Sequence, residues 1–481
     1  MTIGVACQRM LIRSDPLLRL EARALFECAS DVFRHSEKSL FNDRDQMSKT
    51  RKPLSALVIG SGLIGVASAY FLRKRGFTVT VVDRQAAPGL ETSFANGSLQ
   101  TPSMAEPWNT PGCWRTLLRS IGRQDSAMQL RLRALPGLAR WGIDFLRNSA
   151  PEIYRNSIQS NLRLALFSQS VMSELQRDTR IEYGRSAVGS LRVFRDSESF
   201  RRARAAAASL AGAGLRFRVL PSEKAVEFEP ALQPIRSELA GAIHYGSDET
   251  GNAYKFCASL ADRAMKDGVE FRFGSTVSVL ELSADRIEAV VVGGERLIAD
   301  RYVVAAGSHS RRLLKTVGLD LPVQPVKGYS ITFDKSANPS RLRIPIVDDD
   351  LHAAIVPLEG MMRVAGTAEF AGHDLTLRPA RIANLNDLLR RVLPDTKFDP
   401  SKAIPWCGLR PVSVDGVPVI GPTPISNLFV NTGHGHLGWT LAAGSGELLA
   451  NLVARIASPI ATAPFEFARF AATRSTTATY T

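Results

Sequence analysis

Three glycines near residue 60 constrain the fold more than any other feature of this 481-residue chain. Gly60, Gly62 and Gly65 stand between an apolar run at 54–59 and a helical pattern at 66–75. A second apolar run follows at 77–82 and ends at Asp83. A buried strand, a glycine-rich turn, a helix and a second strand form the unit that binds a dinucleotide. The sequence therefore predicts an α/β protein with a Rossmann-like, mostly parallel sheet.

Each residue of this unit has a physical role in binding a dinucleotide. Gly60 permits the tight turn, Gly62 lets the backbone approach a pyrophosphate, and Gly65 lets the helix pack close to the strand. The pyrophosphate is then expected at the helix N-terminus, where free N–H groups and the helix dipole favour an anion. Asp83 is expected to accept both ribose hydroxyls of an adenosine, and its charge disfavours the 2′-phosphate of NADP.

Two further apolar runs, at 302–307 and 428–433, each end in glycine and are predicted to be strands. The second leads through His434 and Gly438 into a helical run at 441–450. The glycine pattern alone does not separate FAD from NAD. A second helix N-terminus late in the chain favours FAD, because its amides can stabilise negative charge on a reduced flavin ring.

Several features exclude other classes of protein. Residues 53–72 carry no charge, a length that could span a membrane, but the glycines in the middle indicate a strand–turn–helix junction instead. The net charge is +14, yet basic residues are interleaved with acidic ones and no nucleic-acid motif accompanies them. We therefore expect no nucleic-acid partner, and at most peripheral contact with an anionic membrane on its inner, cytoplasmic face.

The cysteines and the two ends of the chain bear on the compartment and on the extent of the folded part. Five cysteines occur without C-x-x-C spacing, which argues against a disulfide framework and against a metal site, and suits the cytoplasm. Residues 1–46 mix arginines with acids and lack the apolar core of a signal peptide. We interpret them as a dispensable extension, or as the product of a start codon upstream of the true one at Met47. Residues 461–481 are interpreted as a C-terminal tail.

Several blocks beyond the glycine pattern are typical of one superfamily. They are Glu-Thr-Ser-Phe-Ala-Asn-Gly at 91–97, Asp-Glu-Thr-Gly at 248–251, Val-Lys-Gly-Tyr-Ser at 326–330, Gly-Leu-Arg-Pro at 408–411, Asp-Gly-Val-Pro at 415–418 and the stretch 432–440. With them, the chain resembles the FAD-dependent amine oxidoreductases of the D-amino acid oxidase and glycine oxidase superfamily. Within it, the chain is most similar to the D-amino acid dehydrogenases. The resemblance runs over nearly the whole chain except the two ends.

The resemblance implies two domains. A discontinuous FAD-binding domain would comprise 53–110, 236–319 and 401–460. A substrate domain built on a mostly antiparallel sheet with helices would comprise 111–235 and 320–400. The alternating run at 189–194 fits an antiparallel strand of that second domain, and 256–265 and 269–273 are predicted to be a helix and a strand of the first.

The resemblance also implies a set of site residues. Oxidising an amino acid requires a grip on its carboxylate, for which arginine is suited, and Arg410 occupies the family's Gly-Leu-Arg-Pro motif. Tyr329 is a second catalytic candidate, although a core tyrosine with a backbone partner is nearly as good an interpretation. The cofactor-binding candidates are Val58, Ile59, Gly60, Ser61, Gly62, Leu63, Ile64, Gly65, Asp83, Arg84, Ser93, Asn96, Gly97, Val277, Ala306, Gly307, His434, Gly435, Leu437, Gly438, Trp439 and Thr440.

Other histidines and cysteines are given weaker roles. His436 is a lesser candidate than His434 for contact with flavin or substrate. Four further histidines are interpreted as structural: His244, His309, His352 and His373. Cys407 lies near Arg410, but its register does not match the position at which related enzymes attach flavin covalently. We interpret it as a small buried side chain.

The function implied by the resemblance is the oxidation of D-amino acids to 2-oxo acids and ammonia. A hydride would move from Cα to flavin N5, and the electrons would pass to an acceptor other than oxygen, such as a membrane quinone. The stretch 347–357 departs from the family pattern, with Leu351 and His352 where a tyrosine is expected, which points to a bulkier or cyclic substrate. A sarcosine-, glycine- or D-hydroxyproline-type amine oxidoreductase and a non-catalytic flavin-binding subunit remain alternatives, and the oligomeric state stays open.

Overall fold

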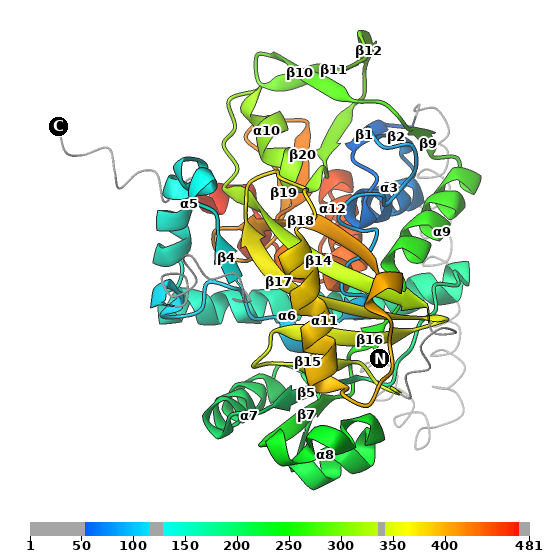
Figure 1. Cartoon of the computed structure of the whole chain (residues 1–481). Helices are drawn as coiled ribbons and strands as arrows, with labels where there is room; N and C mark the ends of the chain where they lie inside the picture. Colours follow the sequence, from blue (N-terminus) through cyan, green and yellow to red (C-terminus); the bar gives the residue numbers. More distant parts are fainter. Residues whose placement is uncertain (1–52, 116–127, 335–341, 471–481) are drawn as a thin grey trace, which may run out of the picture. The chain divides into compact units, whose positions relative to one another are not determined.

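The computed structural model describes residues 53–115, 128–334 and 342–470 (Figure 1). The described residues from Leu54 onward belong to one compact unit. The predicted extension at 1–46 lies outside the described residues. The first half of the predicted tail forms two short 3-10 helices, η7 (Ala463–Phe465) and η8 (Phe467–Phe470).

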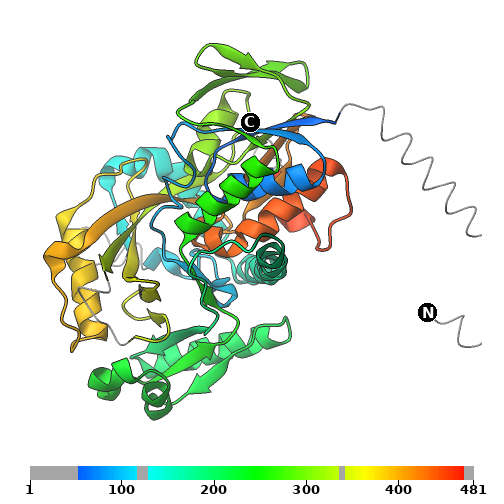
Figure 2. The same cartoon turned by 90° about the vertical axis from the view of Figure 1, so that its right-hand side faces the viewer.

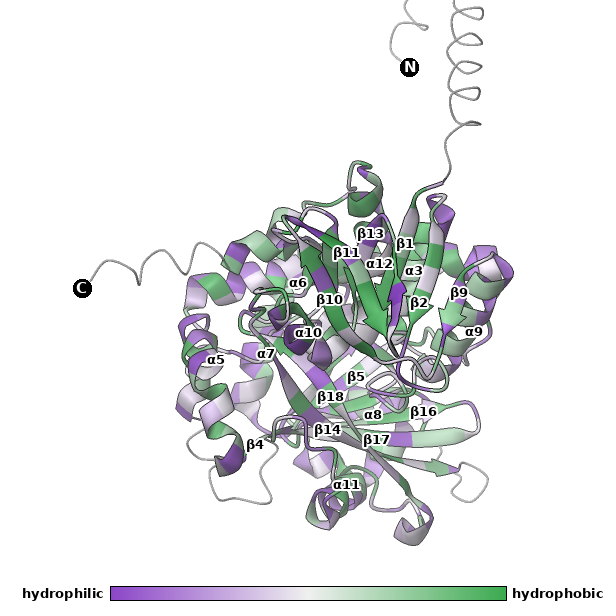
Figure 3. Cartoon of the chain, turned by 90° about the horizontal axis from the view of Figure 1, so that it is seen from above, coloured by the Kyte–Doolittle hydropathy of each residue, from purple (hydrophilic) through white to green (hydrophobic). Residues whose placement is uncertain are grey.

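A six-stranded sheet carries the glycine-rich turn. Its strands are, in spatial order, β19 (Val419–Pro422), β20 (Leu428–Thr432), β13 (Arg301–Val304), β1 (Ser55–Ile59), β2 (Thr78–Val82) and β9 (Glu270–Arg272). All neighbours are parallel except β19, which is antiparallel to β20. β1 and β2 are largely hydrophobic in Figure 3 and buried in the core, as strands covered on both faces must be. The predicted Rossmann-like sheet is confirmed.

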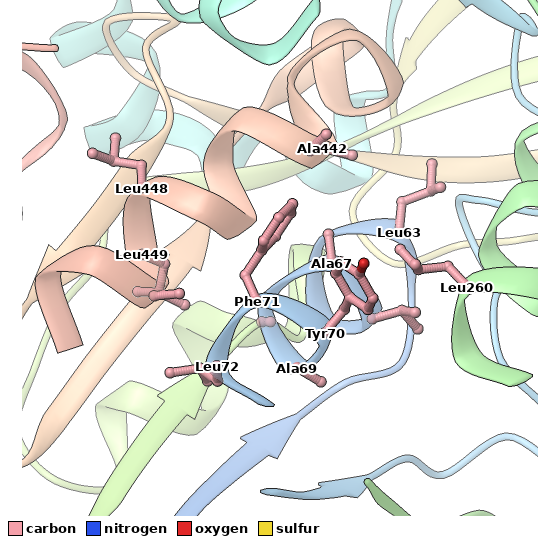
Figure 4. Close-up of a cluster of buried hydrophobic side chains, with 14 of the residues drawn as sticks. Leu63, Ala67, Ala69, Tyr70, Phe71, Leu72, Leu260, Ala442, Leu448 and Leu449 are labelled. Carbon is pink, nitrogen blue, oxygen red and sulfur yellow. The ribbon is translucent and has the colours of Figure 1, made fainter. Parts of the chain in front are cut away.

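Three helices pack against this sheet and against one another: α3 (Leu63–Lys74), α9 (Ala253–Lys266) and α12 (Gly438–Ala454). α3 and α12 lie side by side (Figure 2). Phe71 from α3 and Ala442 and Leu449 from α12 belong to one buried hydrophobic cluster (Figure 4). A Cβ on Gly446 would lie 2.7 Å from the carbonyl carbon of Ala67, so the close approach of the two helices requires glycine there. The uncharged run 53–72 is thus divided between β1 and α3. In the described part of the chain, every helix is too short or too polar to span a bilayer.

A larger sheet forms the second part of the molecule. Its main path is β18 (Ile404–Ser413), β14 (Val323–Asp334), β17 (Met361–Phe370), β16 (Ala353–Leu358), β15 (Ile346–Asp348), β5 (Ser190–Phe194), β7 (Gly241–Tyr245) and β6 (Arg218–Leu220), and β4 (Met128–Leu130) pairs with β17. Most neighbours are antiparallel; β15 with β5 and β17 with β4 are parallel. The run at 189–194 is therefore a strand as expected, antiparallel to β7.

Helices and smaller sheets cover the two large sheets. α11 (Pro379–Val392) packs across β14, β17 and β16 (Figure 1). The other helices within the described residues are α5 (Leu135–Arg147), α6 (Pro151–Thr179), α7 (Ser197–Ala211), α8 (Ser222–Phe228), α10 (Ser310–Lys315) and the 3-10 helices η1 (Pro102–Met104), η2 (Leu132–Ala134), η3 (Pro230–Glu238), η4 (Gly307–His309), η5 (Pro400–Lys402) and η6 (Gly435–Leu437). The remaining strands are β10 (Val277–Ser283), β11 (Arg286–Val292) and β12 (Glu295–Leu297) in one sheet, and β3 (Leu99–Gln100) and β8 (Glu249–Thr250) in another.

The domain boundaries predicted from the sequence remain a prediction. β7 and β18 fall in the ranges assigned to the FAD-binding domain, but both pair within the larger sheet. β18 enters that sheet through β14 and then leads to β19 and β20 of the six-stranded sheet. The chain therefore crosses between the two sheets beside Arg410.

Candidate active site

A cavity of about 1200 Å³ lies at the carboxyl ends of β1, β2 and β13. Ile59, Val82 and Ala305 line this end of it, and residues of β14, β17 and β18 line the opposite wall. Ligand sites in proteins usually measure about 300–1,000 Å³. This cavity is therefore large enough for a cofactor together with a small substrate.

The glycine-rich turn forms one wall of the cavity. Gly60 has a φ of 109°, and a Cβ there would lie 2.6 Å from the carbonyl oxygen of Ala305. A Cβ on Gly65 would lie 1.8 Å from the carbonyl oxygen of Gly60. Neither position can therefore hold a side chain. Gly60 is needed for the tight turn and Gly65 for the close packing of helix on strand, as the sequence predicts. Ser93 ties the following loop to the start of α3, because its hydroxyl accepts a hydrogen bond from the Leu63 N–H at 3.1 Å.

Asp83 ends β2 at the edge of the cavity. Its Oδ2 accepts hydrogen bonds from the Ser61 N–H at 2.5 Å and the Ser61 hydroxyl at 2.7 Å, and its Oδ1 accepts one from the Gln85 N–H at 2.8 Å. A carboxylate has about four acceptor positions. One position remains for a ribose hydroxyl, rather than the two that the sequence interpretation assumed.

Arg84 and His309 meet on the same wall. Arg84 donates to Glu91 at 2.6 Å and to the Nε2 of His309 at 2.9 Å. Burial, and then the charge of Arg84, lowers the pKa of His309 to about 4, so this ring is a neutral acceptor near pH 7. His309 was expected to be structural, but it lines the cavity.

The start of α12 forms the wall nearest the larger sheet. Nε2 of His434 lies 2.9 Å from the hydroxyl of Ser445, and burial lowers the pKa of His434 to about 3. Nδ1 of His434 and Nε1 of Trp439 are buried without a hydrogen-bond partner among the described residues. Buried polar atoms are nearly always paired. These two atoms therefore fit a bound group that supplies hydrogen-bonding partners at the N-terminus of α12.

Most of the predicted cofactor-binding residues come together around this cavity. Those that line it are Ile59, Gly60, Gly62, Leu63, Ile64, Asp83, Arg84, Ser93, Asn96, Gly97, Val277, Ala306, Gly307, His434, Gly435, Gly438 and Trp439. Those that lie behind the lining are Val58, Ser61, Gly65, Leu437 and Thr440. The second group supports the wall: the Thr440 hydroxyl, for example, accepts a hydrogen bond from the Thr101 N–H at 2.9 Å.

Arg410 lies on the opposite wall. Its Nη1 donates to the carbonyl oxygen of Thr367 at 3.2 Å, and Thr367 itself has the strained φ of 63°. Burial lowers the pKa of Arg410 to about 10, and none of the described residues offers it a carboxylate within ion-pair distance. A Cβ on Gly328 would overlap the guanidinium, 2.0 Å from Nη1. The glycine of one sequence block therefore makes room for the arginine of another.

Trp108 and His436 complete the surroundings of Arg410. The guanidinium lies 5.3 Å from the Trp108 ring centre, and Trp108 stacks on His436 with ring centres 5.3 Å apart and planes within 8°. Nε2 of His436 lies 3.0 Å from the Met104 carbonyl oxygen, so Nε2 carries the proton and donates it. Burial lowers the pKa of His436 to about 4. The sequence patterns gave no signal that Trp108 belongs to the site.

Tyr329 is among the residues that line the cavity, but its side chain, like that of Cys407, points to the other face of the sheet. They oppose each other across β14 and β18, one residue after Gly328 and one before Gly408, and successive side chains of a strand point to opposite faces. The Tyr329 hydroxyl donates to Glu369 at 2.5 Å, and the Cys407 thiol donates to the Leu375 carbonyl at 3.1 Å. We therefore do not carry Tyr329 forward as a carboxylate-binding residue, and the position of Cys407 offers no support for covalent flavin attachment.

The cavity also contains a polar cluster that sequence reasoning missed. Glu106, Tyr154, Arg192 and Asp349 line it together. They come from a loop, from α6, from β5 and from the turn after β15, and no motif connects them. Asp349 does fall in the stretch 347–357, where the departure from the family pattern indicated contact with substrate.

Comparisons with known proteins place the chain in a family. The model of the family described as FAD dependent oxidoreductase matches residues 55–452. The chain belongs to this family, whose members depend on FAD, and the glycine turn, Asp83 and the α12 N-terminus fit that cofactor. It is 41% identical over 401 residues to the D-amino acid dehydrogenase of Paramagnetospirillum magneticum, covering 83% of this chain and 95% of that one. It is 40% identical over 416 residues to the D-amino acid dehydrogenase of Xanthobacter autotrophicus, covering 86% and 99%.

Solved structures show the same fold. Glycine oxidase from Geobacillus kaustophilus superposes with a TM-score of 0.68 at 23% identity, covering 86% of this chain and 99% of that one. L-proline dehydrogenase from P. horikoshii superposes with a TM-score of 0.69 at 16% identity, covering 88% and 99%. The protein is thus an FAD-dependent oxidoreductase, as the sequence predicted.

Proposed function

We propose that this protein oxidises D-amino acids to 2-oxo acids and ammonia. In the overall reaction, a D-amino acid, water and an oxidised acceptor give a 2-oxo acid, ammonia and the reduced acceptor. Arg410 carries the proposal, because it is a partly buried cation in the cavity whose only described partners are a carbonyl oxygen and an aromatic ring. A charge in that position is costly unless a ligand pairs with it. The relatives named D-amino acid dehydrogenase support both the substrate class and its configuration.

Arg410 and the residues around it have different roles in binding the substrate. Arg410 is suited to a bidentate grip on the α-carboxylate, and Trp108 holds the guanidinium plane through cation–π contact. His434 and His436 are neutral near pH 7, so they add no charge that competes for the carboxylate. The glycine turn, Asp83 and the start of α12 would hold FAD, which would supply the acceptor for the hydride lost from Cα. The protein then contributes mainly orientation of the substrate and exclusion of water.

The experiment that tests this proposal uses the purified holoenzyme without oxygen. D- and L-amino acids are added separately, and loss of the visible flavin absorption is recorded. Reduction by D-amino acids alone supports the proposal. Reduction only by secondary amines such as sarcosine would favour the alternative amine oxidoreductase, and reduction by no amine would favour a non-catalytic subunit.

We also propose an acceptor other than oxygen, such as a quinone reached by peripheral contact with a membrane. The exposed face of α5 supports this, because Leu135, Ile143 and Leu146 are 40%, 53% and 39% exposed and Arg140 and Arg147 lie on the same helix. Helices of this kind bind anionic bilayers through apolar burial and charge attraction.

Vesicle binding tests this second proposal. The protein should sediment with phosphatidylglycerol vesicles and much less with phosphatidylcholine vesicles. An Ile143→Glu, Leu146→Glu variant should lose that binding. The matched control is Ile298→Glu, which alters an exposed apolar side chain elsewhere. Equal loss in both variants, or equal binding to both kinds of vesicle, would contradict the proposal.

A further inference from the structure

The polar cluster of Glu106, Tyr154, Arg192 and Asp349 has an unusual balance of charge for a cavity wall. Nε of Arg192 donates to Oδ1 of Asp349 at 2.7 Å, and Nη2 donates to the same oxygen. Nη1 of Arg192 lies 3.5 Å from Oε2 of Glu106. One guanidinium therefore lies between two carboxylates. The three groups together carry one net negative charge.

The protonation states support this count. Burial would lower the pKa of Arg192, but attraction by Glu106 and Asp349 raises it overall, so the guanidinium stays charged. Burial, and then Glu106, raises the pKa of the Tyr154 hydroxyl, which therefore stays neutral. Asp348 adds no free negative charge, because it pairs with Arg195 at 3.0 Å. Asp350 is exposed and accepts the neutral backbone N–H of Arg195 at 2.6 Å, so its negative charge adds to that of the cluster on the cavity wall.

Of the two carboxylates, Glu106 makes the weaker interaction with Arg192. Its contact with Arg192 is at the outer limit of a hydrogen bond, and its other oxygen accepts no hydrogen bond from a described residue. Its side chain is 29% exposed and lines the cavity. It has spare acceptor capacity that a cation entering the cavity can use.

The chain path brings Glu106 close to the carboxylate-binding side. Glu106 and Trp108 are two residues apart, so their Cα atoms are separated by at most about 7.6 Å. The Trp108 ring in turn lies 5.3 Å from the guanidinium of Arg410. The positive Arg410 and the negative Glu106 thus line the same cavity and are connected through the segment that carries Trp108.

We propose that Glu106, backed by the Asp349–Arg192 pair, binds a cationic side chain of the substrate, so that the enzyme prefers D-amino acids with basic side chains. This inference rests on the proposed function and specifies its substrate class. With the α-carboxylate on Arg410, a guanidinium or ammonium at the end of the side chain would reach the negative cluster. Pairing two opposite charges in a partly desolvated cavity discriminates strongly against a neutral analogue.

The test compares D-arginine with D-citrulline, which has the same length and a neutral urea in place of the guanidinium. Both share the α-carboxylate and α-amine, so the ratio of their kcat/KM values isolates the side-chain charge. Wild-type holoenzyme should favour D-arginine about tenfold or more. Glu106→Gln retains an acceptor for Arg192 but removes the charge, and it should bring the ratio towards one by lowering kcat/KM for D-arginine alone. Glu281→Gln, on the surface hairpin beside Arg296, is the control that should keep the wild-type ratio.

Each other outcome overturns the inference. A wild-type ratio near one would do so without any variant. An equal fall for both substrates in Glu106→Gln would assign Glu106 to the shared α-amine or to the fold. If the variant does not fold, the ratio of kcat/KM for D-lysine to that for D-norleucine on the wild-type enzyme tests the same side-chain charge. A ratio near one overturns the inference. Rapid flavin reduction by D-methionine with no preference for basic side chains would refute this inference and leave the proposed function standing. No reduction by any D-amino acid would refute both.

Discussion

Strands β14 and β18 present two faces that differ in how their charges are paired. On the cavity face, Arg410 lies over Gly328 and meets a carbonyl oxygen and a tryptophan ring. On the opposite face, Lys327 is fully buried, 3.4 Å from the carboxylate of Glu369 and 3.5 Å from that of Asp374. The same two strands therefore hold one charge without a counterion and another within a dense ion-pair network.

The face that carries Lys327, called here the network face, stabilises the fold. Glu369 accepts a hydrogen bond from Tyr329 and pairs with Arg131 and with Arg378, the latter at 3.2 Å. Burial alone would raise the pKa of Glu369, but Tyr329 and Arg131 together lower it. A buried polar network of paired charges and hydrogen bonds can rigidify a core. The difference between the faces indicates that buried charge is paired where it supports the fold and left open where a ligand is to bind.

The largest expected effect comes from breaking the network face. Glu369→Gln leaves Lys327 and its neighbouring arginines without their central anion, which should lower the free energy of unfolding by about 3–5 kcal/mol. Denaturant unfolding of the holoenzyme measures it. Glu281→Gln, in an exposed pair with Arg296, should cost less than about 1 kcal/mol. Equal free energies of unfolding for the two variants would mean that the buried network does not stabilise the fold more than an exposed ion pair does.

Breaking the cavity face should affect catalysis instead. Arg410→Ala removes the carboxylate grip and should lower kcat/KM by an amount equivalent to about 2–5 kcal/mol. FAD content should be retained, and stability should not fall, because the variant removes a partly buried charge that has no counterion. Steady-state kinetics and flavin absorbance measure both. An unchanged kcat/KM would exclude Arg410 from the site.

Tyr329→Phe separates the two interpretations of this tyrosine. Its hydroxyl donates to a buried carboxylate, so the variant should lose about 1.5–3 kcal/mol of unfolding free energy. KM should change little. A raised KM for D-amino acids at unchanged stability would instead support the role in carboxylate binding that the resemblance suggested.

The neutral histidines of the cavity face predict a pH dependence. Their ordinary pKa of 6.5 is lowered by burial to about 3 in His434 and about 4 in His436, so the unfolded chain binds more protons between about pH 4 and 6.5. This contribution to stability is present above pH 6.5 and is lost as the pH falls, by up to about 1.4 kcal/mol per pH unit and histidine. His436→Gln should flatten the dependence of unfolding free energy on pH, and exposed His352→Gln should not. Identical slopes would mean that His436 is charged in the folded protein.

Much of the fold could be predicted from the sequence, because the patterns that indicate it lie within short segments. The run 54–83 contains a strand, turn, helix and strand in direct succession, and the geometry of Gly60 and Gly65 follows from contacts within that unit and with the adjacent strand. α3 begins at Leu63, before the predicted start at 66, because the turn leads directly into the helix. The later strands at 302–307 and 428–433 were visible as short apolar runs, and they join the same sheet.

The site was less readable, because it depends on which face of a strand each side chain occupies. The blocks 326–330 and 408–411 both stood out in the sequence, and Arg410 was identified by its motif. The register of β14 against β18 decides that Gly328 lies under Arg410 while Tyr329 faces Glu369, since a shift of one residue exchanges the two faces. The same holds for Glu106, Arg192 and Asp349, which are far apart in the chain and meet only when the larger sheet has formed. Local patterns thus determined the cofactor unit, and long-range strand pairing determined which charges remain open for a substrate.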